Sequence, residues 1–185
     1  MIIYADFTSA YCYLASLRLD RLMAAGHDPV DWRAVEHRPG LPRPGLHLKG
    51  TARLIRGREL AATRCLLTHG EEFEARNPRC LPNTRSVNAA YALARAHGFG
   101  DQARRAIFDG YWVQGLHIGD PDVVRRLVPT MLYQPSQSLR TPTEDWQREW
   151  LTLATGIDLT IVSAHHIECG QAALEQLAGN PLRVA

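Results

Sequence analysis

Residues 2–16 read Ile2-Ile3-Tyr4-Ala5-Asp6-Phe7-Thr8-Ser9-Ala10-Tyr11-Cys12-Tyr13-Leu14-Ala15-Ser16, and this stretch decides the fold. Residues 2–7 are apolar enough for a buried strand. Thr8 or Ser9 can then cap a helix, because a short hydroxyl side chain accepts hydrogen bonds from the free N–H groups of a helix start. The leucines that follow recur on one face, so we expect a helix over residues 10–25.

A second strand is expected soon after this helix. Residues 30–37 alternate with period two, which is typical of a strand. A strand, a helix and a second strand in this order favour parallel pairing of the two strands through a right-handed crossover. Residues 2–37 therefore predict an α/β unit.

The rest of the chain predicts a helical segment and then a return to the sheet. Residues 38–46 are rich in proline and glycine and predict a loop, and residues 50–150 carry mostly helical patterns. We expect a further loop over 133–143, a strand over 157–162 followed by a short hairpin, and a final helix over 170–178. This order predicts a small α/β domain with a helical lobe inserted into it.

Composition excludes several classes of protein. The 185 residues are 45% apolar and 22% charged, which suits one domain with a real core and excludes a disordered chain. The formal net charge is +2, which gives no electrostatic basis for binding nucleic acid, and no apolar run reaches the ~18–20 residues of a membrane-spanning helix. Because no basic and apolar leader precedes Ile2, we expect a cytoplasmic protein without nucleic-acid or membrane partners.

Cysteine usage argues against a disulfide scaffold. The four cysteines are far apart and form no Cys-x-x-Cys pair; they are Cys12, Cys65, Cys80 and Cys169. In a reducing compartment each is expected to be a buried, unreactive thiol. The cluster His165-His166-x-Glu168-Cys169 contains metal-ligand types, but its spacing matches no zinc template, so we expect no metal.

The turn between the first strand and the first helix is the most informative candidate site. A helix N-terminus has unpaired N–H groups and a partial positive charge, so it stabilises an anion, including a thiolate. Ser9 lies at the tip and Cys12 one turn further, so both can face the same point. Two interpretations stay open from the local sequence: a thiol site, or a capping serine beside a buried cysteine.

Two separated stretches resemble one family. Residues 6–16 are similar to the pattern Asp-Phe-x-[Cys/Ser]-Pro-[Trp/Tyr]-[Cys/Ser]-[Tyr/Trp]-Leu of the DsbA-like thioredoxin family, which includes 2-hydroxychromene-2-carboxylate isomerases and kappa-class glutathione transferases. Residues 108–121 resemble the end of that family's helical insertion. The resemblance implies an α/β, thioredoxin-like fold with an inserted all-helical lobe. It assigns residues 1–45 and 155–185 to the thioredoxin-like domain and 46–154 to the insertion.

The resemblance also implies the site residues. Ser9 stands where redox members keep the attacking cysteine, and the second motif cysteine is retained as Cys12. Ala10 replaces the motif proline, and Thr160 takes the place of the family's cis-proline, where a trans peptide is expected because a non-proline cis bond is costly. The expected catalytic residues are Ser9 and Cys12, and the expected thiol- or substrate-binding residues are Ala10, Tyr11, Leu159 and Thr160.

Three functions are compatible with this pattern. The first is a DsbA-like member of the oxidoreductase family with thiol-dependent chemistry at Ser9, since a hydroxyl cannot cycle through a disulfide. The second is a thiol-dependent isomerase or transferase, in which Ser9 donates a hydrogen bond to the sulfur of glutathione. The third is a non-catalytic relative that binds a ligand or partner. We expect an enzyme with no tightly bound cofactor, glutathione or another small thiol such as mycothiol as co-substrate, and a homodimer as a common form among such proteins.

Overall fold

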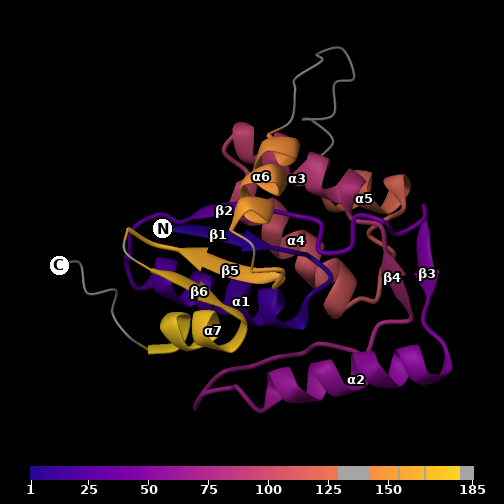
Figure 1. The fold of residues 1–185 in the computed structure, drawn as a ribbon, viewed down its shortest axis with the longest axis horizontal. Coiled ribbons are helices and arrows are strands. Elements are labelled where there is room, and N and C mark those ends of the chain that lie inside the picture. Colours follow the sequence, from indigo (N-terminus) through magenta and orange to yellow (C-terminus); the bar gives the residue numbers. More distant parts are fainter. Residues whose placement is uncertain (129–141, 154, 165, 180–185) are drawn as a thin grey trace.

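The computed structural model describes residues 1–128, 142–153, 155–164 and 166–179. A four-stranded mixed sheet forms its centre, in the order β2-β1-β5-β6 (Figure 1). Its strands are β1 (Ile2–Ala5), β2 (Asp31–Ala34), β5 (Leu159–Val162) and β6 (Ile167–Cys169). β1 and β2 are parallel, whereas β5 is antiparallel to both β1 and β6, so the expected strand–helix–strand unit and the later hairpin are both confirmed.

Helices cover the sheet on both faces. They are α1 (Ala10–Ala24), α2 (Gly50–Arg64), α3 (Arg85–Ala96), α4 (Gly100–Trp112), α5 (Pro121–Leu127), α6 (Thr143–Thr152) and α7 (Gly170–Gly179). In Figure 1, α1 and α7 lie side by side below the sheet and α6 lies above it, while α3 and α6 both contact β2. The α/β, thioredoxin-like class with a helical insertion is therefore confirmed. Most of the expected loop over 133–143 lies outside the described residues.

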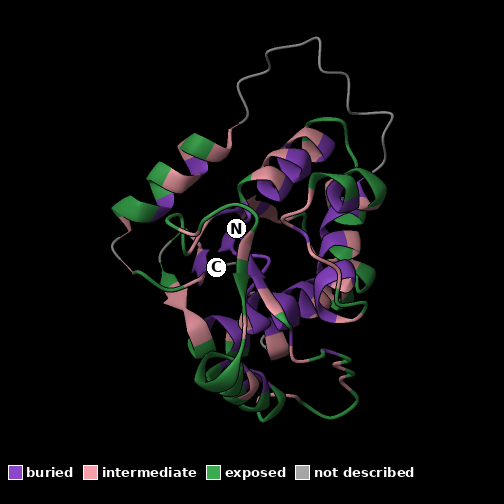
Figure 2. Cartoon of the chain, turned by 90° about the vertical axis from the view of Figure 1, so that its right-hand side faces the viewer, coloured by how far each residue is buried: buried purple, intermediate pink, exposed green. Residues whose placement is uncertain are grey.

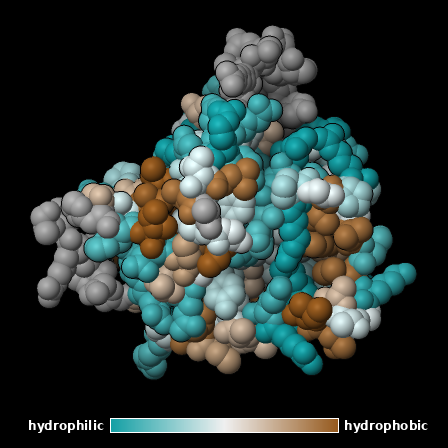
Figure 3. All heavy atoms as spheres, in the orientation of Figure 1, coloured by the Kyte–Doolittle hydropathy of each residue, from teal (hydrophilic) through white to brown (hydrophobic). Residues whose placement is uncertain are grey.

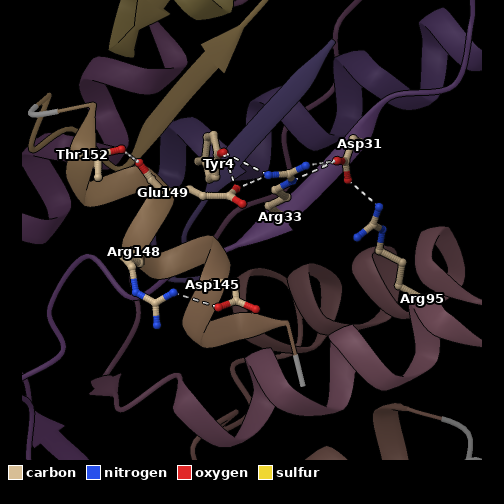
Figure 4. A network of polar contacts seen from close by, with 8 residues as sticks. All are labelled: Tyr4, Asp31, Arg33, Arg95, Asp145, Arg148, Glu149 and Thr152. Atoms are coloured by element: carbon tan, nitrogen blue, oxygen red, sulfur yellow. Dashed lines mark hydrogen bonds and ion pairs between the residues drawn. The ribbon is translucent and has the colours of Figure 1, made fainter. Parts of the chain in front are cut away.

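A charged network fastens α6 and α3 to the sheet (Figure 4). Arg33 of β2 bonds to Asp31 at 2.7 Å and to Glu149 of α6, and it donates to the Tyr4 hydroxyl at 3.1 Å. The second oxygen of Asp31 pairs with Arg95 of α3 at 2.5 Å. Because one strand contacts both helices through this network, the position of α6 relative to α3 is fixed at the edge of the sheet.

The segment 46–154 is not entirely helical, which corrects the expectation of an all-helical lobe. β3 (Gly45–His47) and β4 (Cys80–Pro82) form a second, two-stranded antiparallel sheet, and α2 ends at Arg64 although the pattern predicted a longer helical stretch. Strands of three residues are too short to show a period of two, and Pro82 is an unusual strand residue. Their pairing depends on a tertiary contact rather than on a local pattern.

One hydrophobic core joins the sheet to the inserted helices. Phe7, at the end of β1, contacts the ring of Phe108 in α4 with centroids 4.9 Å apart. Tyr13 of α1 stacks on Trp112 of α4 at 6.2 Å. Phe108, Tyr111 and Trp112 are each 1% exposed, so they belong to the core. Figure 2 shows the buried residues along the inner sides of the helices around this core.

The outer surface is mostly hydrophilic. Figure 3 shows separate hydrophobic patches divided by hydrophilic residues on the face seen in Figure 1. Exposed apolar residues include Leu46 of β3 and Leu54 and Ile55 of α2. Within the described part of the chain, no helix has the length and apolar character that crossing a membrane requires.

Candidate functional site

The turn from β1 into α1 is built around a buried carboxylate. Asp6 is 2% exposed, and its Oδ1 accepts hydrogen bonds from both the backbone N–H and the hydroxyl of Thr8, each at 2.7 Å. Its Oδ2 accepts the backbone N–H of His37 at 2.8 Å, just beyond β2. These bonds end β1 at Ala5 and fix the chain direction at the start of α1.

Ser9 is the N-cap of α1, as the sequence predicted. Its backbone is extended, and its Oγ accepts the N–H of Cys12 at 3.3 Å. The N–H groups of Ala10 and Tyr11 donate to no other described residue. Two backbone donors and the positive end of α1 therefore meet beside the Ser9 hydroxyl, which is an arrangement that favours a bound anion.

Cys12 is held as a neutral thiol. The expectation of buried thiols is confirmed for Cys12 but is wrong for Cys65, which is exposed, and for Cys80 and Cys169, which are half-buried. Cys12 is fully buried, and its S–H donates to the carbonyl oxygen of Asp158 with an Sγ–O distance of 2.9 Å. Burial raises the pKa of Cys12 well above the usual thiol value of 9.0, and the neighbouring Asp158 charge raises it further. The hydrogen bond from Ser9 acts in the opposite direction but is outweighed. At neutral pH this sulfur is a hydrogen-bond donor rather than a nucleophile.

The structure brings some of the predicted site residues together and separates others. Ser9, Ala10, Tyr11 and Cys12 share the first turn of α1. Leu159 lies on the adjacent strand and pairs with Ala5, directly after the residue whose carbonyl meets Cys12. These positions agree with a single site at the end of β1.

Thr160 faces away from this site. Its hydroxyl donates to the carbonyl of Ile157 at 3.1 Å and accepts from Trp150 Nε1 at 3.4 Å, on the α6 side of the sheet. The residue that faces Cys12 is Asp158, two positions earlier, because the chain before Leu159 passes the start of α1. Among the described residues only the Arg43–Pro44 peptide is cis, so the peptide before Thr160 is trans.

Sequence reasoning missed Arg56, which reaches the site from α2. Its guanidinium donates to the carbonyl of Thr8 and, at 2.6 Å, to Glu59, and it lies 5.8 Å from the Trp112 ring. Arg56 is 7% exposed, so it helps to close the site. An arginine in a helix usually faces solvent, and no local signal distinguishes this one.

Asp6, His37 and Asp158 were also missed as site residues. Asp6 had a usable signal, because a carboxylate directly after a buried strand and before a helix cap is placed to bind free N–H groups. The roles of His37 and Asp158 depend on which strands pair, so their own sequence gives no indication. His37 Nε2 lies 3.1 Å from the carbonyl of Gly156, which joins β2 to the loop before β5.

Metal-binding geometry is absent from the part of the chain that the structure describes. No group of three or more His, Cys, Asp or Glu side chains there is placed to hold an ion. His165, one member of the cluster considered from the sequence, lies outside the described residues.

A sheet with this strand order, a buried carboxylate after β1 and a polar cap on α1 define a thioredoxin-like protein with a helical insertion. Residues 1–131 match the family model of the DSBA-like thioredoxin domain, and the chain belongs to this family. Comparison with curated proteins finds no match.

Solved structures share the fold at low sequence identity. A crystal structure described as a probable DsbA oxidoreductase from Streptomyces coelicolor superposes with a TM-score of 0.71 and 16% identity, covering 96% of this chain and 86% of that one. The structure of a 2-hydroxychromene-2-carboxylate isomerase superposes with a TM-score of 0.59 and 17% identity, covering 96% of this chain and 92% of that one. The cytosolic disulfide reductase DsbM from Pseudomonas aeruginosa, solved with GSH, superposes with a TM-score of 0.59 and 18% identity, covering 92% of this chain and 89% of that one. The structural neighbours thus include proteins described as oxidoreductases and one described as an isomerase.

Proposed function

We propose that the amino end of α1 binds the sulfur of a low-molecular-weight thiol, such as glutathione, for a thiol-dependent isomerisation or transfer. The observation that carries the proposal is the pairing of a serine N-cap with a buried, neutral Cys12. The Oγ of Ser9 accepts the Cys12 N–H, and a thiol that enters would compete with the Cys12 sulfur for the hydroxyl proton of Ser9. Together with the N–H groups of Ala10 and Tyr11, this hydroxyl would supply three donors to a thiolate.

This arrangement would activate the bound thiol by lowering its pKa. Hydrogen bonds to the charged form and the positive helix end both favour thiolate over thiol. A larger thiolate fraction at neutral pH accelerates attack on an electrophilic carbon or double bond. Ser9 would therefore hold the reacting sulfur without forming a covalent bond to it.

Dithiol exchange fits the site less well. Such exchange needs an accessible thiolate that attacks a disulfide and a second thiol that resolves the mixed disulfide. Ser9 cannot form a disulfide, and Cys12 is buried, protonated and bonded to the Asp158 carbonyl. These facts favour the isomerase and transferase type over the redox type within the family.

A second candidate is a non-catalytic relative, and the burial of the site favours it. Ser9 is 2% exposed and Ala10 3%, so a thiol reaches them only if covering residues such as Arg56 move. A protein that never opens here would use the cap and the Cys12 bond for stability alone.

Three variants separate these candidates. Glutathione and mycothiol are titrated calorimetrically into the wild type, Ser9→Ala, Ser9→Cys and a control, Ser163→Ala, in the turn after β5. We expect the wild type and the control to bind a thiol and to lower its pKa by about one unit or more, read from thiolate absorbance. Ser9→Ala should lose most of that shift, and Ser9→Cys should reduce insulin disulfides at least about tenfold faster than the wild type.

Contrary results have distinct meanings. If the wild type reduces insulin disulfides as fast as Ser9→Cys, Cys12 exchanges as a single thiol and the isomerase or transferase proposal is wrong. If neither thiol binds to the wild type, the non-catalytic candidate replaces it.

A further inference from the structure

A polar cavity lies away from the amino end of α1. It has a volume of about 360 Å³ and is lined by the end of β2, by Glu36 just beyond it, and by the first turns of α3 and α6. Ala34 and Ala89 give it apolar walls, and Glu36, Asn88 and Gln147 give it polar ones. None of Ser9 to Cys12 lines it, so this cavity is not part of the proposed thiol site. Its volume is within the range of small-molecule sites.

Two buried oxygen atoms at this cavity have no hydrogen-bond donor among the described residues. Asn88 is 2% exposed, and its Oδ1 is unpaired. Glu36 Oε2 is also buried and unpaired. Buried polar atoms are normally satisfied, and two unsatisfied acceptors in residues that line the same cavity indicate a missing donor.

The charges around the cavity favour a cation. Glu36 Oε1 accepts from Arg85 Nε at 3.2 Å, but the Arg85 side chain is 62% exposed, so water screens this pair. Glu144 adds a second carboxylate to the lining and is exposed like Arg85, so water screens both charges; the two carboxylates and one guanidinium leave the lining with a net negative charge. Gln147 offers little to a ligand, because its amide already bonds to both the N–H and the carbonyl of Glu36, at 2.7 and 3.0 Å.

We propose that this cavity binds a small organic cation that carries N–H donors, namely a primary ammonium or guanidinium group on a short alkyl chain. The Glu36 carboxylate and the Asn88 amide would turn toward the cavity so that Glu36 Oε2 and Asn88 Oδ1, which are buried, accept the N–H groups of the cation. Its methylene groups would lie against Ala34 and Ala89. An anion is disfavoured by the two carboxylates, Glu36 and Glu144.

The proposed cation site adjoins the turn before α1 through the backbone. Glu36 is followed directly by His37, whose N–H is bonded to Asp6, and Asp6 also holds the N–H of Thr8. The proposal does not depend on the thiol chemistry, since the unpaired atoms and the charges belong to α3, α6 and the residue Glu36 that follows β2.

Calorimetric titration of the purified protein with 1,4-diaminobutane and agmatine tests the proposal. We expect a Kd of about 1 mM or below for at least one of them. 1,4-Butanediol and succinate, which match the chain length without the positive charge, should bind at least about tenfold more weakly. A lysine derivative with blocked amino and carboxyl ends is titrated as well. If it binds more tightly than the free amines, a protein side chain is the natural ligand; if the free amines bind more tightly, a small amine is.

Single substitutions locate the binding. Glu36→Gln should weaken diamine binding by about tenfold or more, and Asn88→Leu should weaken it to a similar degree while the variant melts no lower than the wild type, because an unpaired acceptor is removed. Glu175→Gln, the same chemical change on α7, should leave the Kd within about twofold. If Asn88→Leu does not fold, Glu36→Gln decides the location. Absence of amine binding at about ten times the expected Kd, equal binding of butanediol, or an unchanged Kd in Glu36→Gln would overturn the proposal.

Discussion

The Oγ of Ser9 and the Sγ of Cys12, one helical turn apart, have opposite roles although both belong to short polar side chains. Ser9 Oγ accepts a hydrogen bond from the α1 backbone and can donate its own proton to a sulfur. Cys12 Sγ keeps its proton and donates it in a hydrogen bond to the Asp158 carbonyl. The environment, rather than the residue type, therefore decides which of the two can meet a ligand.

Chemical modification measures the state of Cys12. In variants that each keep one cysteine, we expect iodoacetamide to react with Cys12 at least about a hundredfold more slowly than with the exposed Cys65, because reaction needs local opening. The rate at Cys12 should still be rising at pH 9.0, since burial holds its pKa above that value. Equal rates for both cysteines would show that the α1 site is open.

The raised pKa of Cys12 also makes stability depend on pH in a definite direction. The unfolded thiol loses its proton near 9.0, whereas the folded thiol keeps it. The contribution of Cys12 is therefore complete below pH 9.0 and falls as the pH rises through the folded pKa. Cys12→Ala should remove this alkaline loss in urea unfolding curves.

Arg18, in the middle of α1, connects this helix to α7 and to the chain that follows α2. Its guanidinium donates twice to Glu71 at 2.8 Å, once to the carbonyl of Leu174 in α7 at 2.6 Å, and once to that of Leu66 at 2.7 Å. The side chains of Arg18 and Glu71 are 3% and 4% exposed. The chain that follows α2 is thus held against α1 by a paired, buried charge rather than by apolar packing alone.

Glu71→Ala should lower the free energy of unfolding by about 3–5 kcal/mol, because the substitution leaves the buried Arg18 charge without its partner. Glu72→Ala, at the exposed neighbouring position, should change it by about 0.5 kcal/mol or less. Urea denaturation at pH 7 gives both values. A loss below about 1 kcal/mol for Glu71→Ala would mean that the pair contributes no more than a surface ion pair.

Acid titration provides a second test of this pair. Burial raises the pKa of Glu71, but hydrogen bonds from Arg18 and the backbone of Thr68 outweigh it and lower the pKa from 4.5 to about 2. The stabilisation is therefore present above pH 4.5 and is lost as the pH falls through about 2. This acid loss should be smaller in Glu71→Gln than in the wild type.

At the scale of the whole molecule, the inserted helices and the sheet form one unit. Arg104 of α4 is fully buried, donates to the carbonyl of Ser16 at 3.0 Å and to Asp20 at 2.5 Å, and lies 5.3 Å from the Trp32 ring of β2. Aromatic contacts between Phe7 and Phe108 continue the same connection. A core shared in this way leaves neither part with a complete interior of its own.

We expect Arg104→Met to lower the free energy of unfolding by about 3 kcal/mol, since Ser16 and Asp20 lose a buried donor. Arg105→Met, which removes the half-exposed partner of Asp20, should cost about 1 kcal/mol or less. Tryptophan fluorescence and far-ultraviolet circular dichroism should give one coincident urea transition in each protein. Two separate transitions would show that the helical insertion folds independently of the sheet.

Local sequence patterns predicted the order of the main elements, the parallel β1–β2 pair and a hydroxyl cap at Thr8 or Ser9, which the structure places at Ser9. These features depend on patterns within a few residues, namely apolar runs, a hydroxyl cap and turn residues. The same local logic placed Cys12 in the first turn of α1, and the resemblance of residues 6–16 indicated the family.

Tertiary structure alone decided which groups meet. The β3–β4 sheet, the contact of Asp158 rather than Thr160 with Cys12, and the approach of Arg56 to Thr8 all join residues more than 30 positions apart. Strand register and helix packing select such contacts from many alternatives of similar local preference. Burial then set the state of the Cys12 thiol, because a pKa depends on the solvent and charge around a group, which no short stretch of sequence specifies.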